Sequence, residues 1–123
     1  MNFPEPTNLR VVRVREAGQA RERVLIRARR ACNLGKYAIV GVTIDGNGYF
    51  PTNRQIYWFP DAEVEAGDLI VLQTLDGIDG AFPNAEGKTT HRFHWALTKP
   101  VWTSLRVPCL VLIGAADFAD EVT

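Results

Sequence analysis

The short spacing of turn-forming residues restricts the fold of this chain more than any other feature. Gly, Pro, Asn and Asp recur at short intervals, and the segments between them have the patterns of β-strands. We expect about seven short strands, over residues 9–15, 23–31, 37–45, 55–59, 69–75, 90–97 and 107–113. This arrangement predicts an all-β fold, an immunoglobulin-like two-sheet β-sandwich, with a small closed barrel as the alternative.

The segment over residues 23–31 has two interpretations. Val24 and Ile26 alternate with Arg and Leu, which is the pattern of a half-buried strand. An Arg-rich helix within residues 19–34, closed at its C-terminal end by Gly35, is the alternative. We favour the strand because a tight Val-Leu-Ile run is followed by continued alternation.

Two of the other expected strands, residues 37–45 and 69–75, are apolar on both faces. Such strands are typical of the centre of a sheet that is covered on both sides. The first of them ends in residues 45–48 (DGNG), where the Asp-Gly and Asn-Gly pairs predict a tight reversal of the chain.

The 123 residues are the size of one domain, and we expect residues 1–123 to form a single β-sandwich. The contents of 46% apolar and 23% charged residues are typical of a soluble globular protein. The longest apolar runs, such as residues 109–116, are shorter than the ~20 residues that span a bilayer. The sequence MNFPEPTNLR at the N-terminus lacks the apolar region of a signal peptide. We therefore expect a cytoplasmic protein without a membrane partner.

The charges are unevenly distributed although the net charge is zero. Residues 1–36 contain nine Lys and Arg against three Glu, whereas residues 37–123 contain five basic side chains against eleven acidic ones. One interpretation is a basic face for an anionic partner, formed by Arg21, Arg23, Arg27, Arg29 and Arg30. The interpretation we favour is that opposite charges pair across neighbouring strands and neutralise each other.

The histidines and cysteines do not have the spacing of a metal site. His91 and His94 are three residues apart, so on a strand they would point to opposite faces. One His together with Cys32 and Cys109 matches no known zinc spacing. We predict no metal, with one packed and one surface histidine. The two cysteines are expected to be free thiols rather than a disulfide, since the chain shows no export signal.

No motif indicates an enzyme or a cofactor. The only serine, Ser104, lies in an expected turn and not in a G-x-S-x-G sequence, and apolar neighbours of Cys109 would keep its thiol unreactive. The carboxylates of Asp76 and Asp79 belong to turn-forming sequence and lack the further oxygen ligands of a Ca²⁺ site. Phosphate-loop glycine patterns are also missing. The sequence predicts no catalytic residues.

The aromatic residues have a structural and a functional interpretation. Rings next to Arg-rich sequence can form a stacking platform for single-stranded nucleic acid. More often, aromatic side chains on short strands form the core. We favour the core, and expect Trp58 and Trp95 to be buried.

Several segments resemble the lamin-tail-domain-like proteins of bacteria. The resemblance covers about two-thirds of the chain and rests on patterns of turn and core residues, which recur in sandwiches. The segments that carry it are residues 32–37 (CNLGKY), 57–61 (YWFPD), 65–72 (EAGDLIVL), 89–95 (TTHRFHW) and 100–102 (PVW). Where that family tends to have Trp-Asn followed by a Gly-Asp turn, residues 102–106 read WTSLR. The resemblance implies an immunoglobulin-like sandwich that serves as an adhesive or scaffolding module, with no shared catalytic residues.

The sequence and the resemblance together predict a non-catalytic, macromolecule-binding or scaffolding module whose partner is another protein. The alternative is a nucleic-acid-associated module that uses the five arginines named above. Retention on a nucleic-acid or heparin resin that weakens with salt would favour the alternative.

Overall fold

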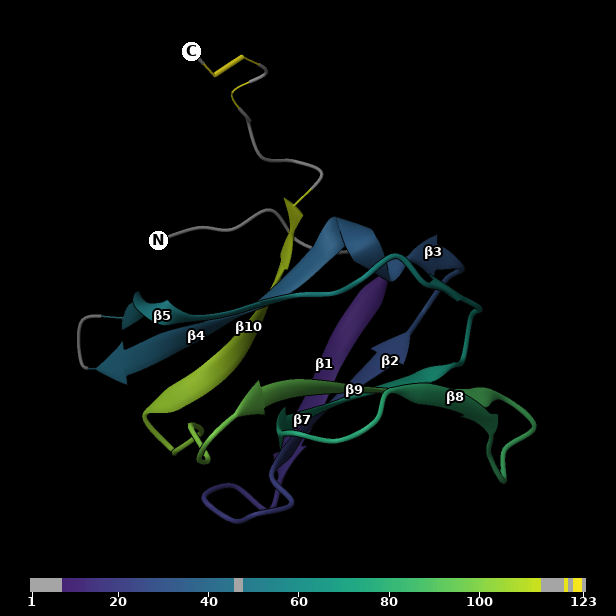
Figure 1. The fold of residues 1–123 in the computed structure, drawn as a ribbon, viewed down its shortest axis with the longest axis horizontal. Helices are drawn as coiled ribbons and strands as arrows, with labels where there is room; N and C mark the ends of the chain where they lie inside the picture. Colours follow the sequence, from purple (N-terminus) through teal and green to yellow (C-terminus); the bar gives the residue numbers. More distant parts are fainter. Residues whose placement is uncertain (1–7, 46–47, 114–118, 120, 123) are drawn as a thin grey trace.

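The computed structural model describes residues 8–45, 48–113, 119, 121 and 122. It contains β1 (Leu9–Arg15), β2 (Arg23–Ala28), β3 (Cys32–Asn33), the 3₁₀ turn η1 (Leu34–Lys36), β4 (Tyr37–Asp45), β5 (Gly48–Trp58), β6 (Glu63–Val64), β7 (Leu69–Leu75), β8 (Gly80–Pro83), β9 (Thr89–Leu97) and β10 (Arg106–Leu112). These strands form a five-stranded sheet in the order β1-β2-β7-β9-β8, a three-stranded sheet in the order β10-β4-β5, and the short pair β3-β6 (Figure 1).

The two larger sheets pack face to face, so the predicted all-β, two-sheet sandwich is confirmed. Their inner faces meet in one apolar core, to which the five-stranded sheet contributes Ile26 and Leu72 and the other sheet Ile39 and Leu110. In β2 the buried positions alternate strictly with partly exposed ones, because successive side chains of a strand point to opposite faces. That alternation fixes the strand register, since a shift by one residue would expose the whole apolar row.

Each expected strand has a counterpart among β1, β2, β4, β5, β7, β9 and β10. The helical alternative for residues 19–34 is wrong, because β2 is a strand paired with both β1 and β7. The expected reversal at residues 45–48 joins an antiparallel hairpin in which Asp45 pairs with Gly48, while residues 46–47 lie outside the described residues. The sequence did not reveal β3, β6 and β8, which are two to four residues long.

One pair of strands, β7 and β9, is parallel. Parallel strands need a connection that crosses from one end of the sheet to the other. Here the chain leaves β7, passes through residues 76–79, forms the edge strand β8 and turns back into β9, which lies between β7 and β8. Residues 76–79 therefore cross β9 and meet the side chain of His94.

The aromatic side chains form the core, as expected for most of them. Rings of Tyr57, Phe59, Phe93, Trp95 and Trp102 make a chain of contacts between the sheets, with centroid separations of 5.1 to 5.9 Å. Trp102 is 2% exposed, and Trp95 is partly buried. The expectation that Trp58 is buried is wrong: it is 53% exposed. Trp58 lies next to Tyr57 on the edge strand β5 and therefore points to the opposite, outer face.

A buried carboxylate connects three separate parts of the five-stranded side of the sandwich. Glu22, just before β2, is fully buried and accepts hydrogen bonds from the Thr74 hydroxyl at 2.5 Å and the backbone N–H groups of Gly18, Val101 and Trp102 at 2.9 to 3.0 Å. Four donors satisfy an ion that would be costly to bury alone. Glu22 thereby joins the β1–β2 turn, the end of β7 and the segment before β10.

Within the described residues, no helix has the length and apolar character needed to cross a membrane.

Candidate functional site

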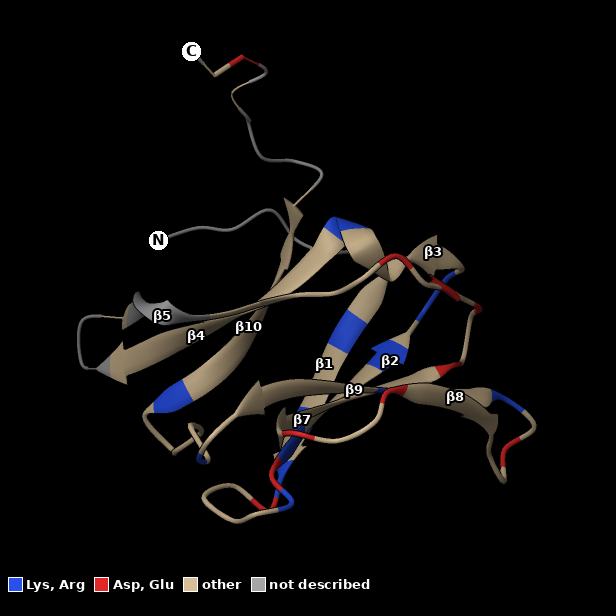
Figure 2. Cartoon of the chain, viewed as in Figure 1, with Lys and Arg blue, Asp and Glu red and all other residues tan. Residues whose placement is uncertain are grey.

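The outward side of β1 and β2 is a surface of arginines, which we call the arginine face and define as Arg10, Arg13, Arg15, Arg23 and Arg27. The two strands are antiparallel neighbours, and their register places Arg10 opposite Arg27 and Arg15 opposite Arg23. The apolar side chains of β2 occupy the inner face and are buried. Lys and Arg colour both strands in Figure 2, whereas Asp and Glu lie mostly in the connecting segments.

A β-bulge brings the β1 arginines together. With regular alternation, Arg10 would point to one face of β1 and Arg13 and Arg15 to the other. The register instead shifts between Val11 and Arg13, which leaves Val12 as the extra residue. Beyond this shift Arg13 and Arg15 share the outer face with Arg10, and all three are exposed. Bulges are known to redirect side chains in this way and are frequent at sheet edges and binding sites.

Few acidic groups neutralise the arginine face. Arg23 forms an ion pair with Glu16. Arg27 donates to the Gly67 carbonyl at 3.1 Å and lies 3.5 Å from the Glu86 carboxylate. Arg10, Arg13 and Arg15 form no ion pair with an acidic residue in the described part of the chain.

The neighbouring strand does not neutralise the face either, because the β7 residues opposite β2 are uncharged: Leu69, Val71 and Gln73 are among them. Our favoured interpretation of the charge distribution, pairing of opposite charges across strands, is therefore wrong for β1 and β2, where arginine faces arginine.

The arginine face contains a hollow with a volume of about 450 Å³. It is lined by Arg10, Val12, Arg13, Arg27 and Arg29. The bulged residue Val12 provides the apolar part of this lining, while four guanidinium-bearing side chains surround it. Such a concentration of positive charge can bind an anionic group through several charge-assisted hydrogen bonds.

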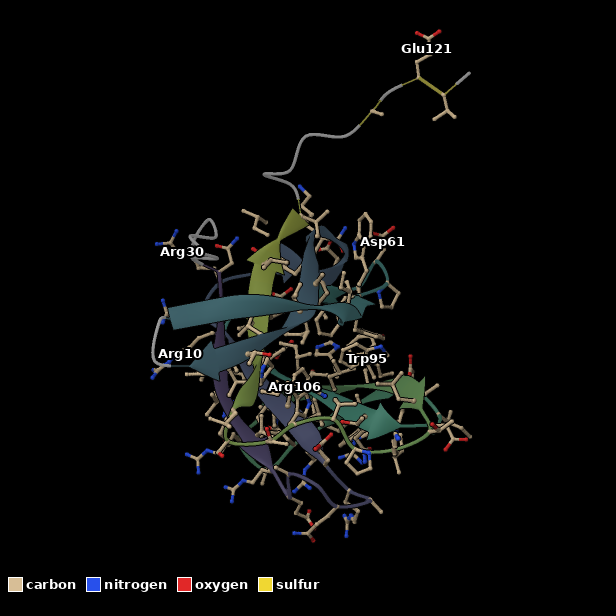
Figure 3. All side chains as sticks on the ribbon, turned by 90° about the vertical axis from the view of Figure 1, so that its left-hand side faces the viewer. Arg10, Arg30, Asp61, Trp95, Arg106 and Glu121 are labelled. Carbon is tan, nitrogen blue, oxygen red and sulfur yellow. The ribbon has the colours of Figure 1, made fainter. Side chains whose placement is uncertain are left out.

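The structure brings together part of the predicted arginine set. Arg23 and Arg27 lie on the arginine face, and Arg29 lines its hollow. Arg21 lies in the β1–β2 turn, where its carbonyl accepts from Arg23, and Arg30 is exposed beyond β2. In Figure 3, Arg30 and Arg10 lie on the same side of the molecule, opposite to Asp61.

The three arginines of β1 are not in the set predicted from the sequence. Three arginines in seven residues could have indicated a basic surface, but simple alternation assigns them to two different faces. Only the pairing with β2 shows that they share one face.

The two histidines are both engaged with acidic side chains and largely covered, so the expectation of one packed and one surface histidine is wrong. Their side chains are 13% exposed for His91 and 8% for His94. His94 lies between Asp79 and Gln73, with ring nitrogens 3.0 Å and 3.1 Å from their oxygens. Gly77 packs so closely on this ring that an added Cβ would collide with it.

His91 pairs with a buried aspartate. Its Nε2 lies 2.9 Å from Oδ2 of Asp68. The same carboxylate accepts from the backbone N–H of Glu65 through Oδ2 and from that of Thr89 through Oδ1. Burial opposes the ionisation of Asp68, but these hydrogen bonds outweigh it and hold the pKa of the carboxyl below its usual value. Asp68 thereby ties the turn before β7 to the start of β9.

Neither cysteine lines the hollow of the arginine face. Both are free thiols, and burial raises the pKa of each, with the nearby Glu63 adding to the effect at Cys32. No group of three or more His, Cys, Asp or Glu that could hold a metal ion occurs among the described residues.

A second surface is apolar. On the outer side of the β10-β4-β5 sheet, Ile56 and Trp58 are 56% and 53% exposed and lie opposite Val40 and Ala38. The indole N–H of Trp58 donates to the Gly35 carbonyl at 2.6 Å. Nothing in the described structure shows what covers this face.

In comparisons with known proteins, the chain matched no family model, no curated protein and no solved structure.

Proposed function

We propose that this chain is a non-catalytic binding module of lamin-tail-like type, and that it binds an anionic macromolecule through its arginine face. The β1 bulge carries the proposal, because it places Arg13 and Arg15 on the face where Arg10 already lies beside the arginines of β2, and all three are exposed. The lamin-tail-like assignment is supported by the sequence resemblance and by the sandwich fold.

The energetics of the arginine face favour a binding role over a structural one. Like charges directly opposite each other on neighbouring strands destabilise a sheet, and opposite charges there stabilise it, by roughly 0.2–1 kcal/mol per pair. Arg10 opposite Arg27 and Arg15 opposite Arg23 are therefore unfavourable choices for stability. Glu16 and Glu86 offset part of this repulsion, and an anionic partner would supply negative charge to Arg10 and Arg15, which form no ion pair among the described residues.

The non-catalytic part of the proposal is supported by the roles of the titratable groups. Both ring nitrogens of His94 contact side-chain oxygens, and His91 is held by the carboxylate of Asp68. These contacts join loops to strands. The arginine face, by contrast, keeps three exposed arginines that form no ion pair among the described residues.

Chromatography on heparin, a sulfated polyanion, tests the proposal. The wild-type protein should be retained and should elute at lower salt after Arg10→Gln. Arg106→Gln removes the same charge from β10, in the other sheet, and should change elution less. Circular dichroism of each variant verifies the fold. If wild type passes unretained at low salt, or both variants elute alike, the arginine face does not bind polyanions.

A further inference from the structure

We infer that the anionic partner is a nucleic-acid duplex, and that the arginine face binds its sugar–phosphate backbone without sequence preference. The inference rests on the proposed function, since it names the ligand of the same face. It follows from the charge density of the face, the geometry of its hollow and the types of side chain that β1 and β2 carry.

The spacing of the arginines matches a duplex better than an acidic protein. Arg10 and Arg15 are five positions apart on β1, and five positions along a bulged strand extend about 15 Å. Each strand of a duplex presents one phosphate per about 3.4 Å of its axis, so about four phosphates of one strand lie along that length. One face of an acidic strand or helix offers a carboxylate only every 5–7 Å, or about three. A duplex therefore offers the arginine face more negative charges, at closer spacing, than an acidic strand or helix does.

The hollow has the chemistry of a phosphate site. Arg10, Arg13, Arg27 and Arg29 surround the same space of about 450 Å³. Each guanidinium presents a rigid fork of donors that matches phosphate oxygens. One phosphodiester group offers two non-bridging oxygens, as many as a carboxylate, but the next phosphate of the same strand follows at a fixed spacing and can offer two more to these four forks. The hollow is therefore better satisfied by a phosphodiester chain than by a single acidic side chain.

The absence of rings from β1 and β2 favours duplex over single-stranded nucleic acid. Single strands are bound largely by stacking their bases on aromatic side chains. The sequences of β1 (LRVVRVR) and β2 (RVLIRA) contain no aromatic residue. The side chains that pack in or against the core include Tyr57, Phe59, Phe93, Trp95 and Trp102, so they do not form a stacking surface beside the arginines. The exposed Phe82 lies at the opposite edge of the sheet, on β8, with Arg92 over its ring.

The absence of sequence preference follows from the same two strands. Neither β1 nor β2 contains the Asn or Gln side chains that recognise adenine edges, and although arginine can also recognise guanine edges, we assign the arginines of this face to phosphates. Contacts to phosphates fix the position of a protein on a duplex but carry no sequence information.

One acidic residue provides a variant with the opposite effect. Glu86 lies 3.5 Å from Arg27, and its side chain is 67% exposed. Its carboxylate competes with a phosphate for that guanidinium. Glu86→Gln should therefore tighten duplex binding, a result that a loss of structure would not produce.

Fluorescence anisotropy at several salt concentrations tests the inference, with a labelled 20-base-pair duplex, one of its single strands, heparin and polyglutamate as ligands. With about four phosphate contacts, the logarithm of the duplex association constant should fall with the logarithm of salt at a slope near −3.6. Arg10→Gln and Arg13→Gln should each reduce the steepness by about one and weaken two duplexes of unrelated sequence equally. Arg106→Gln should leave the slope unchanged.

The outcomes separate the two proposals. If none of the four polyanions binds, the proposed function itself fails. If heparin or polyglutamate binds but the duplex does not, or if the single strand binds more tightly than the duplex, only the duplex inference is overturned. A preference of at least tenfold between the two duplex sequences would overturn sequence-independent backbone binding. Tighter duplex binding by Glu86→Gln, together with the reduced slopes, would support it.

Discussion

Replacement of Glu22 by alanine should destabilise this protein more than the loss of any exposed charge. The carboxylate is fully buried and accepts from four donors. In Glu22→Ala, the Gly18 N–H lies in an exposed turn and can bind water instead. The Thr74 hydroxyl and the N–H groups of Val101 and Trp102 lose their partner within or beside the core.

The magnitude follows from these three donors. A buried polar group that loses its hydrogen bond costs about 1–3 kcal/mol. The N–H of Val101 is only partly buried, so we expect the three unpaired donors together to lower the free energy of unfolding by about 4 kcal/mol. This is a large part of the 5–15 kcal/mol that typically stabilises a domain. Glu22→Gln keeps one acceptor oxygen. Because the Thr74 hydroxyl can reverse and accept from the new amide, one N–H is left unpaired, at about 1–2 kcal/mol.

Urea denaturation followed by tryptophan fluorescence measures these costs. With a slope of about 1.5 kcal/mol per molar urea for a domain of this size, the midpoint should fall by about 2–3 M for Glu22→Ala and about 1 M for Glu22→Gln. Glu86→Gln, at an exposed carboxylate, should leave the midpoint nearly unchanged. If Glu22→Ala lowers the midpoint by less than about 0.5 M, the buried carboxylate does not hold the three segments together.

The remaining predictions also concern stability. Trp102→Ala should cost about 3–5 kcal/mol and Trp58→Ala much less, because only the first side chain fills the core; equal costs in urea denaturation would contradict the burial. The pKa of Asp68 is lower in the folded protein than in the unfolded chain, where it is about 3.9. Asp68 therefore stabilises the fold fully above that unfolded pKa, and this contribution is lost as the pH falls through the lower pKa of the folded protein. Asp68→Asn should therefore flatten the stability–pH curve below pH 4, and an unchanged curve would refute this role. Gly77→Ala should lower the melting temperature because its Cβ collides with the imidazole ring beside it, whereas Gly80→Ala meets open space and should not.

The sequence predicted the sandwich because its main strands have strong local patterns. Val24 and Ile26 alternate with polar or partly exposed neighbours, and β2 buries those positions. The segments of β4 and β7 are apolar on both faces, and both occupy interior positions in their sheets. Patterns of this kind depend only on the period of the strand and on which side chains avoid water.

The arginine face could be predicted only in part, because it depends on pairing between strands. Arg23 and Arg27 share a face by alternation within one strand, so the sequence could place them together. Arg13 and Arg15 join that face through a single extra residue in β1, and no local pattern marks such a bulge. The exposure of Trp58 has a similar cause: sequence indicates an apolar outer face but not whether another element covers it.

Nuclear magnetic resonance offers the most direct test of the central claim, that the arginine face is the binding surface. Backbone amide shifts of the labelled protein would be followed during titration with the 20-base-pair duplex and, separately, with heparin. The largest shift changes should fall within Leu9–Arg15 and Arg23–Ala28, and β4 and β5 should change little. Binding through the arginine face would be refuted if both titrations left β1 and β2 unchanged, or if the largest changes surrounded Ile56 and Trp58.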